Sequence, residues 1–166
     1  WMQIANFIVC GVLVICFAFG LRRVLSPGRA SLWGPLLLGI FGLCLICAGI
    51  FVTDPFLGYP PDAPITATLH GSLHLFVSLI VFISLPAACF VMIRRFVNRP
   101  AWRGWVLYSL ATGILVLLFF VLTDVIANLG LQAPAGLFQR ITISIGWIWV
   151  AVLAFRLLTI QQEQAL

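Results

Sequence analysis

The sequence has very few charged residues and no lysine at all. Only 8% of its 166 residues are charged, whereas 63% are hydrophobic, and the mean hydropathy is +1.20. Soluble domains carry about 25% charged residues, so a water-soluble fold is excluded. The nine basic residues are all arginine and lie between long apolar runs. That placement is typical of membrane topology signals, and no nucleic-acid partner is expected.

Common catalytic and cofactor motifs are also missing. The sequence contains no Gly-rich phosphate loop, no Gly-x-Ser-x-Gly turn and no His-Glu-x-x-His pair. It has two histidines, which is too few for a zinc site built from three. The five cysteines are an odd number and all lie within apolar runs, so they do not indicate a disulfide framework. The Cys44-x-x-Cys47 pair lies in mid-span, without the context of a redox motif.

What the chain does have is a series of apolar runs long enough to cross a membrane. In lipid, only helices and closed barrels satisfy every backbone hydrogen bond, and these runs are too continuous for barrel strands. We therefore predict an all-α fold, a polytopic transmembrane helical bundle that forms a single integral membrane domain over residues 1–166. The five predicted spans are residues 3–21, 33–52, 67–93, 104–127 and 139–160.

The arginines predict the orientation of these spans. Loops 22–32 and 94–103 carry three and four arginines and no acidic residue. Since positively charged loops stay in the cytoplasm, we place both loops there, in a plasma or bacterial inner membrane. The proline-rich loop 53–66 and the N-terminus then face outside, and the C-terminus faces inside.

Glycine and proline predict local features of the spans. Pro86 is expected to kink the third span, and loop 128–138 is expected to turn the chain back. One stripe of the second span consists of small residues, which favour close approach of a neighbouring helix. The residues of this predicted packing seam are Pro35, Gly39, Gly42 and Gly49.

Helix geometry gathers the polar residues near the outer interface. His70 and His74 begin the third span and share one face with Ser78, while Asp124 lies about 30 Å along the fourth span. Polar stripes of this kind normally face the interior of a bundle. We therefore expect an outward-facing polar pocket under loop 53–66. Its candidate residues are Asp54, His70, His74, Ser78, Asp124 and Arg140.

The His70-x3-His74 spacing has several interpretations. An i, i+4 pair can present two imidazoles to one metal ion, with Asp54 as a third ligand and water as the fourth, which would be a zinc site of hydrolase type. Alternatively, both histidines hydrogen-bond carbonyls or carboxylates at the start of the helix, or they act as a proton-linked switch. Asp124 is interpreted as the ion-pair partner of Arg140 or as a site for a proton or coupling ion.

The run GIFVTDPFLGYPPDAPITATLHGSLH resembles the central signature of the family called domain of unknown function 998, a group of bacterial and archaeal integral membrane proteins. The later runs RPAWRGWVLYSLATGILVLL and GLFQRITISIGWIWVAVLAFRLL are similar to it as well. The resemblance implies a membrane bundle of usually six spans, so the first span of the family would be missing here. It also implies that Asp54 and His74 are the important positions. No activity is established for that family.

Three hypotheses for function follow. The first is a non-enzymatic membrane protein that binds or moves a small molecule or lipid at the outward pocket. The second is a metal-dependent intramembrane hydrolase that uses His70, His74 and Asp54. In the third, the chain is a structural subunit of a membrane complex, for which the packing seam is essential and the pocket dispensable.

Overall fold

The computed structural model describes residues 1–25, 28–55, 62–64, 66–130 and 132–165. These residues contain five long α helices and a short 3-10 helix, and no β-strand lies among them. Each long helix is long and apolar enough to cross a membrane, which confirms the predicted all-helical fold with five candidate spans. The elements are α1 (Met2–Leu25), α2 (Arg29–Ile50), α3 (Leu69–Phe96), η1 (Pro100–Trp102), α4 (Arg103–Asn128) and α5 (Gln132–Ala165).

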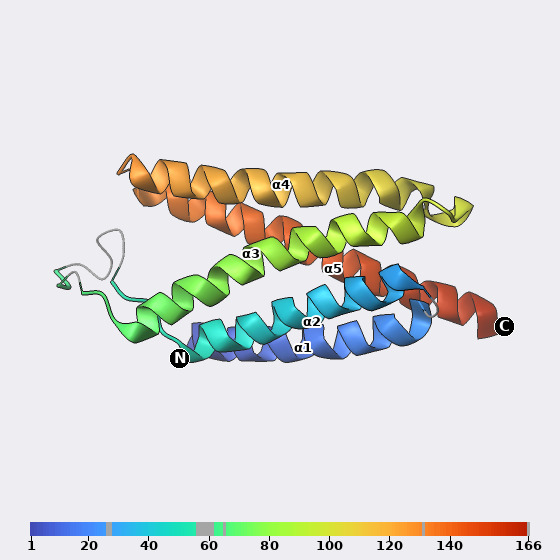
Figure 1. The fold of residues 1–166 in the computed structure, drawn as a ribbon, viewed down its shortest axis with the longest axis horizontal. Coiled ribbons are helices and arrows are strands. Elements are labelled where there is room, and N and C mark those ends of the chain that lie inside the picture. Colours follow the sequence, from blue (N-terminus) through green and yellow to red (C-terminus); the bar gives the residue numbers. More distant parts are fainter. Residues whose placement is uncertain (26–27, 56–61, 65, 131, 166) are drawn as a thin grey trace.

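Each helix packs mainly on the one before it, and successive helices run in opposite directions (Figure 1). The last helix also returns to earlier ones: Trp147 of α5 makes an edge-to-face contact with Phe41 of α2, their ring centroids 5.8 Å apart. Gly146 of α5 faces Leu85 of α3 so closely that a methyl group would not fit between them. We call the end of the bundle that holds residues 51–55, 66–68 and 128–130 the loop end, and the end that holds residues 22–25, 28–31 and 94–103 the arginine end.

Several helix boundaries differ from the predicted spans. α5 begins at Gln132, so the predicted turn over residues 128–138 is much shorter than expected. Pro134 therefore lies in the first turn of α5, where a backbone N–H has no helical acceptor and proline is tolerated. α3 continues through Pro86 as one helix to Phe96.

The last turns of α1 and α3 contain arginines. A helix can extend past the apolar core of a membrane when its charged side chains reach the interface, and this explains why these arginines lie within the helices.

The core is apolar, with its few polar groups paired. Leu38, Cys89, Met92 and Trp149 belong to a cluster of fully buried side chains from α2, α3 and α5. The indole N–H of Trp149 donates a hydrogen bond of 3.0 Å to the hydroxyl of Ser109 on α4, and both side chains are completely buried. An unpaired indole N–H in this surrounding would cost about 1–3 kcal/mol, so this bond holds α5 against α4.

The predicted packing seam on α2 is confirmed for two of its four residues. A methyl group on Gly42 would lie 2.7 Å from the carbonyl oxygen of Gly11 on α1, and one on Gly49 would lie 3.1 Å from Phe7. The prediction is wrong for Gly39, where a methyl group would meet nothing within 4 Å. Pro35 and Gly39 instead line a groove between α1 and α2, because the two helices are in close contact only over the half of the pair nearer the loop end.

We expect Gly42→Ala and Gly39→Ala to have different effects on stability. The added methyl group at Gly42 would push α1 away from α2, at a cost of about 1–3 kcal/mol. The same change at Gly39, less than one turn away, enters open space and favours the helix by up to about 1 kcal/mol. Thermal unfolding of both variants in detergent, followed by tryptophan fluorescence, measures the difference. Equal destabilisation by the two variants would contradict this account of the seam.

Candidate functional site

The Asp54 carboxylate ties the segment after α2 to the first residues of α3. Its two oxygens accept hydrogen bonds from the backbone N–H of Thr68, at 2.8 Å, and from the Thr68 hydroxyl, at 2.6 Å. The same hydroxyl accepts a hydrogen bond of 3.1 Å from the N–H of Gly71 and so caps the helix. A negative charge at the N-terminus of a helix is stabilised further by the helix dipole.

Glycine at position 71 makes this arrangement fit. A methyl group there would overlap the Asp54 carboxylate, so only glycine lets the carboxylate approach the first turn of α3. The hydrogen bonds from the Thr68 hydroxyl and from its backbone N–H favour the ionised form of Asp54 and lower its pKa below the ordinary value, against a smaller opposing effect of desolvation.

His74, one turn after Gly71, joins α3 to the end of α2. Its Nδ1 atom lies 2.7 Å from the carbonyl oxygen of Phe51 and 3.1 Å from that of Ala48. Both neighbours are acceptors, so the proton is assigned to Nδ1 in the neutral ring. The last carbonyls of a helix lack helical partners and need donors when water is scarce, and His74 provides one.

A cavity of about 430 Å³ lies beside His74, between α1, α2, α3 and α5, with Val116 of α4 on its wall. Most of its polar lining side chains come from the loop-end halves of α1, α3 and α5. Among the described residues of the wall, Arg140 of α5 is the one that carries a full charge. Deeper in the bundle the wall is apolar and includes Phe41, Leu85 and Trp147. The cavity therefore has a polar region near the loop end and an apolar region farther in.

The predicted site residues divide into three groups. His74, Ser78 and Arg140 come together on the cavity wall. Asp54 and His70 lie near each other outside it, where His70 is exposed and makes an edge-to-face contact with Phe51. Asp124 is exposed on α4, and no ion pair joins it to Arg140, whose side chain is also exposed.

Several polar residues of the cavity were not among the predicted ones. α1 contributes Gln3, Asn6 and Cys10, and α5 contributes Gln139 and Thr142. The three α1 residues follow the i, i+3, i+7 spacing of one helix face, and this was a signal in the sequence. Sequence analysis of the charged residues and histidines alone does not detect neutral side chains of this kind.

The metal hypothesis stays a prediction. Within the described residues, no three His, Cys, Asp or Glu side chains lie close enough together to hold a metal ion. Asp54 already accepts two hydrogen bonds from Thr68, and Nδ1 of His74 is directed at backbone carbonyls. A metal would have only Nε2 of His74 available on that ring.

Comparison with known families gives a match to a family model described as protein of unknown function (DUF998), over residues 1–156. The chain belongs to the DUF998 family. The match covers every residue that lines the cavity, together with Asp54 and Thr68. No curated protein and no solved structure matches the chain. Membership in DUF998 therefore supports a helical membrane protein and brings no activity with it.

The first prediction for this DUF998 protein concerns Asp54 and pH. A carboxyl group with a lowered pKa stabilises the fold at pH values above its ordinary pKa, and this stabilisation is lost as the pH falls through the pKa of the folded state. At pH values lower than about 4, we expect the unfolding temperature of the wild type to decrease. The Asp54→Asn variant should lack this part of the pH dependence. Asp62→Asn removes a carboxylate from the same loop and serves as the control. Identical pH profiles for the wild type and Asp54→Asn would contradict a stabilising role for the hydrogen bonds between Asp54 and Thr68.

The second prediction separates the two histidines. His74→Phe keeps a ring but loses the donor to Phe51 and Ala48, so it should destabilise the protein by about 1–3 kcal/mol. His70→Phe should have a much smaller effect, because His70 is exposed and its edge-to-face contact with Phe51 tolerates another aromatic ring. Unfolding temperatures and zinc content are measured on the same samples. If the wild type contains near-stoichiometric zinc and each substitution removes it, the result would favour the hypothesis of a metal-dependent hydrolase instead.

Proposed function

We propose that this protein binds, and in that way carries or senses, a small amphipathic molecule with a negative charge at the cavity between α1, α2, α3 and α5. The observation that supports this is the composition of the wall: one arginine and neutral hydrogen-bonding side chains near the loop end, with aromatic and aliphatic side chains farther in. No acidic side chain is among the described residues that line the cavity. The activity proposed is binding and not catalysis.

The wall suggests how such a ligand would be held. Arg140 can form paired, charge-assisted hydrogen bonds with a carboxylate or phosphate, and Gln139 is next to it on α5. Ser78 and His74 lie on the same wall and offer a hydroxyl and a ring nitrogen. The hydrocarbon part of the ligand would be buried against Phe41 and its neighbours. Binding pockets of this type combine an apolar lining with a few polar groups that fix orientation.

The proposed location is a plasma or bacterial inner membrane, with the loop end outside. The distribution of arginine supports this orientation: Arg22, Arg23 and Arg29 lie at one end of the bundle together with Arg94, Arg95 and Arg99. Because positively charged loops remain in the cytoplasm, the cavity would open toward the outer leaflet or the space beyond it.

A fatty acid and its alcohol test the proposal. We expect dodecanoate to raise the unfolding temperature of the purified protein more than dodecanol does, because only dodecanoate is charged. With Arg140→Gln, the same rise in unfolding temperature should require about ten times more dodecanoate. Gly136→Leu should remove the effects of both compounds, because Gly136 lines the cavity and its side chain would occupy space that the ligand needs. A Cβ atom at this position contacts no other protein atom within 4 Å, so the fold should tolerate the change.

Arg103→Gln is the matched control, since it removes one arginine at the arginine end and leaves the cavity unchanged. If dodecanoate stabilises the wild type and Gly136→Leu equally, the ligand is not in the cavity. If neither compound has any effect on the wild type, the binding proposal fails and the structural-subunit hypothesis gains.

A further inference from the structure

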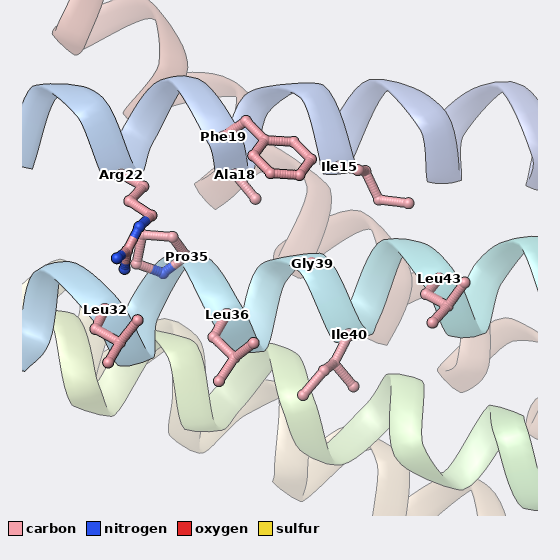
Figure 2. Close-up of a pocket in the computed structure, with 10 residues that line it drawn as sticks. All are labelled: Ile15, Ala18, Phe19, Arg22, Leu32, Pro35, Leu36, Gly39, Ile40 and Leu43. Carbon is pink, nitrogen blue, oxygen red and sulfur yellow. The ribbon is translucent and has the colours of Figure 1, made fainter.

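A second site lies at the opposite end of the bundle and does not depend on the proposed function. It begins as a groove of about 440 Å³ between α1 and α2. Figure 2 shows Phe19 and Ile15 on the α1 side, and Gly39 and Leu36 on the α2 side. The groove exists because the seam at Gly11 and Gly42 does not extend to Gly39, where no neighbouring side chain fills the space.

The groove has the dimensions and polarity of a site for one hydrocarbon chain. Along α2 it extends from Leu32 to Leu43, a rise of about 16 Å at 1.5 Å per residue. That is about half of the roughly 30 Å hydrocarbon core of a bilayer, or one leaflet. Its lining is apolar apart from Arg22, which reaches from α1 toward Pro35 at the arginine end (Figure 2).

At Arg22 the groove continues into a basic pocket of about 650 Å³. The two share Phe19, Arg22 and Leu32, and the pocket adds Arg23 and Arg29. Arg29 also lines a second depression next to this pocket, together with three arginines from the segment 94–103. Six guanidinium groups therefore surround the corner of the bundle formed by the pocket and this depression. None of the described residues that line the groove, the pocket or the depression is acidic. Those three further arginines are Arg94, Arg95 and Arg99.

We propose that this corner binds an anionic phospholipid, with one acyl chain in the groove and the phosphate among Arg22, Arg23 and Arg29. Charge complementarity identifies the occupant, because guanidinium groups at the membrane surface bind phosphate through paired hydrogen bonds. The apolar groove that leads into the arginines favours a lipid over a soluble phosphate. A neighbouring helix in the groove would leave the arginines without an anion.

The experiment uses the whole chain, purified in detergent and depleted of lipid. Native mass spectrometry measures binding of phosphatidylglycerol and phosphatidylcholine with identical acyl chains. We expect phosphatidylglycerol to bind at least tenfold more tightly. Arg22→Gln and Arg23→Gln should each weaken its binding about fivefold, whereas Arg103→Gln, a change of equal charge outside the pocket, should leave it unchanged.

A second pair of variants tests the groove. Gly39→Leu fills it without a clash, because a methyl group at that position meets nothing within 4 Å. It should weaken phosphatidylglycerol binding about tenfold, since the leucine displaces about two methylene groups of the acyl chain. Gly20→Leu adds the same side chain to α1, also in open space but away from the groove, and should have no effect.

Several results would overturn the proposal. Equal binding of the two phospholipids would show that the arginines do not select an anion. Unchanged binding in Gly39→Leu would show that no acyl chain lies in the groove. If Gly39→Leu instead alters self-association while lipid binding is unchanged, the groove accommodates a helix of a second copy. Competition by soluble glycerol phosphate as effective as that of phosphatidylglycerol would show that the site takes any phosphate.

Discussion

The hydrogen bonds between Asp54 and Thr68 define the geometry of the whole loop end. They close a connection of fourteen positions in the sequence, determine where α3 begins and place His74 opposite the last carbonyls of α2. His74 then donates to one or both of those carbonyls, which could not otherwise be satisfied within lipid. The wall of the cavity is a consequence, because His74 and Ser78 face it only if α3 begins in this position. The contacts of His74 with backbone carbonyls correspond to the hydrogen-bonding interpretation of the His70-x3-His74 pair.

The sequence was sufficient to predict the helical bundle, the five candidate spans and the family. Long, continuous apolar runs form helices in lipid, so the bundle and its spans follow from composition, whereas the family followed from the resemblance of particular sequence runs. Of the candidate pocket residues, His74, Ser78 and Arg140 lie on the wall of one cavity, and their role in binding stays a prediction. The pairing of Asp54 with Thr68 was not predicted, because hydrogen bonds between residues fourteen positions apart leave no local pattern in the sequence. Gly39 was misjudged for a similar reason: a glycine on a helix face indicates close packing only if the neighbouring helix stays in contact that far.

The two ends of the bundle have opposite chemistry. At the loop end, Asp54, His70 and Asp124 lie outside a cavity whose wall includes His74 and Arg140. The arginine end has a stack of aromatic rings, in which Phe96 and Trp102 lie 4.8 Å apart and parallel, beside a corner of six guanidinium groups. Phe96 and Trp102 are buried, so the stacked rings hold η1 against the end of α3, while the loop end is built around a cavity.

The return of α5 to α2 and α3 has a consequence for the order of assembly. Helices α1 to α4 each pack on the preceding helix, so they can associate in the order in which they are synthesised. The cavity is different, because Gln139, Arg140 and Trp147 all belong to the last helix. It closes only after α5 has been inserted and the bond between Trp149 and Ser109 has formed. A ligand of this cavity would therefore bind only after α5 has been inserted, and intermediates that end before α5 would be folded in part but unable to bind it.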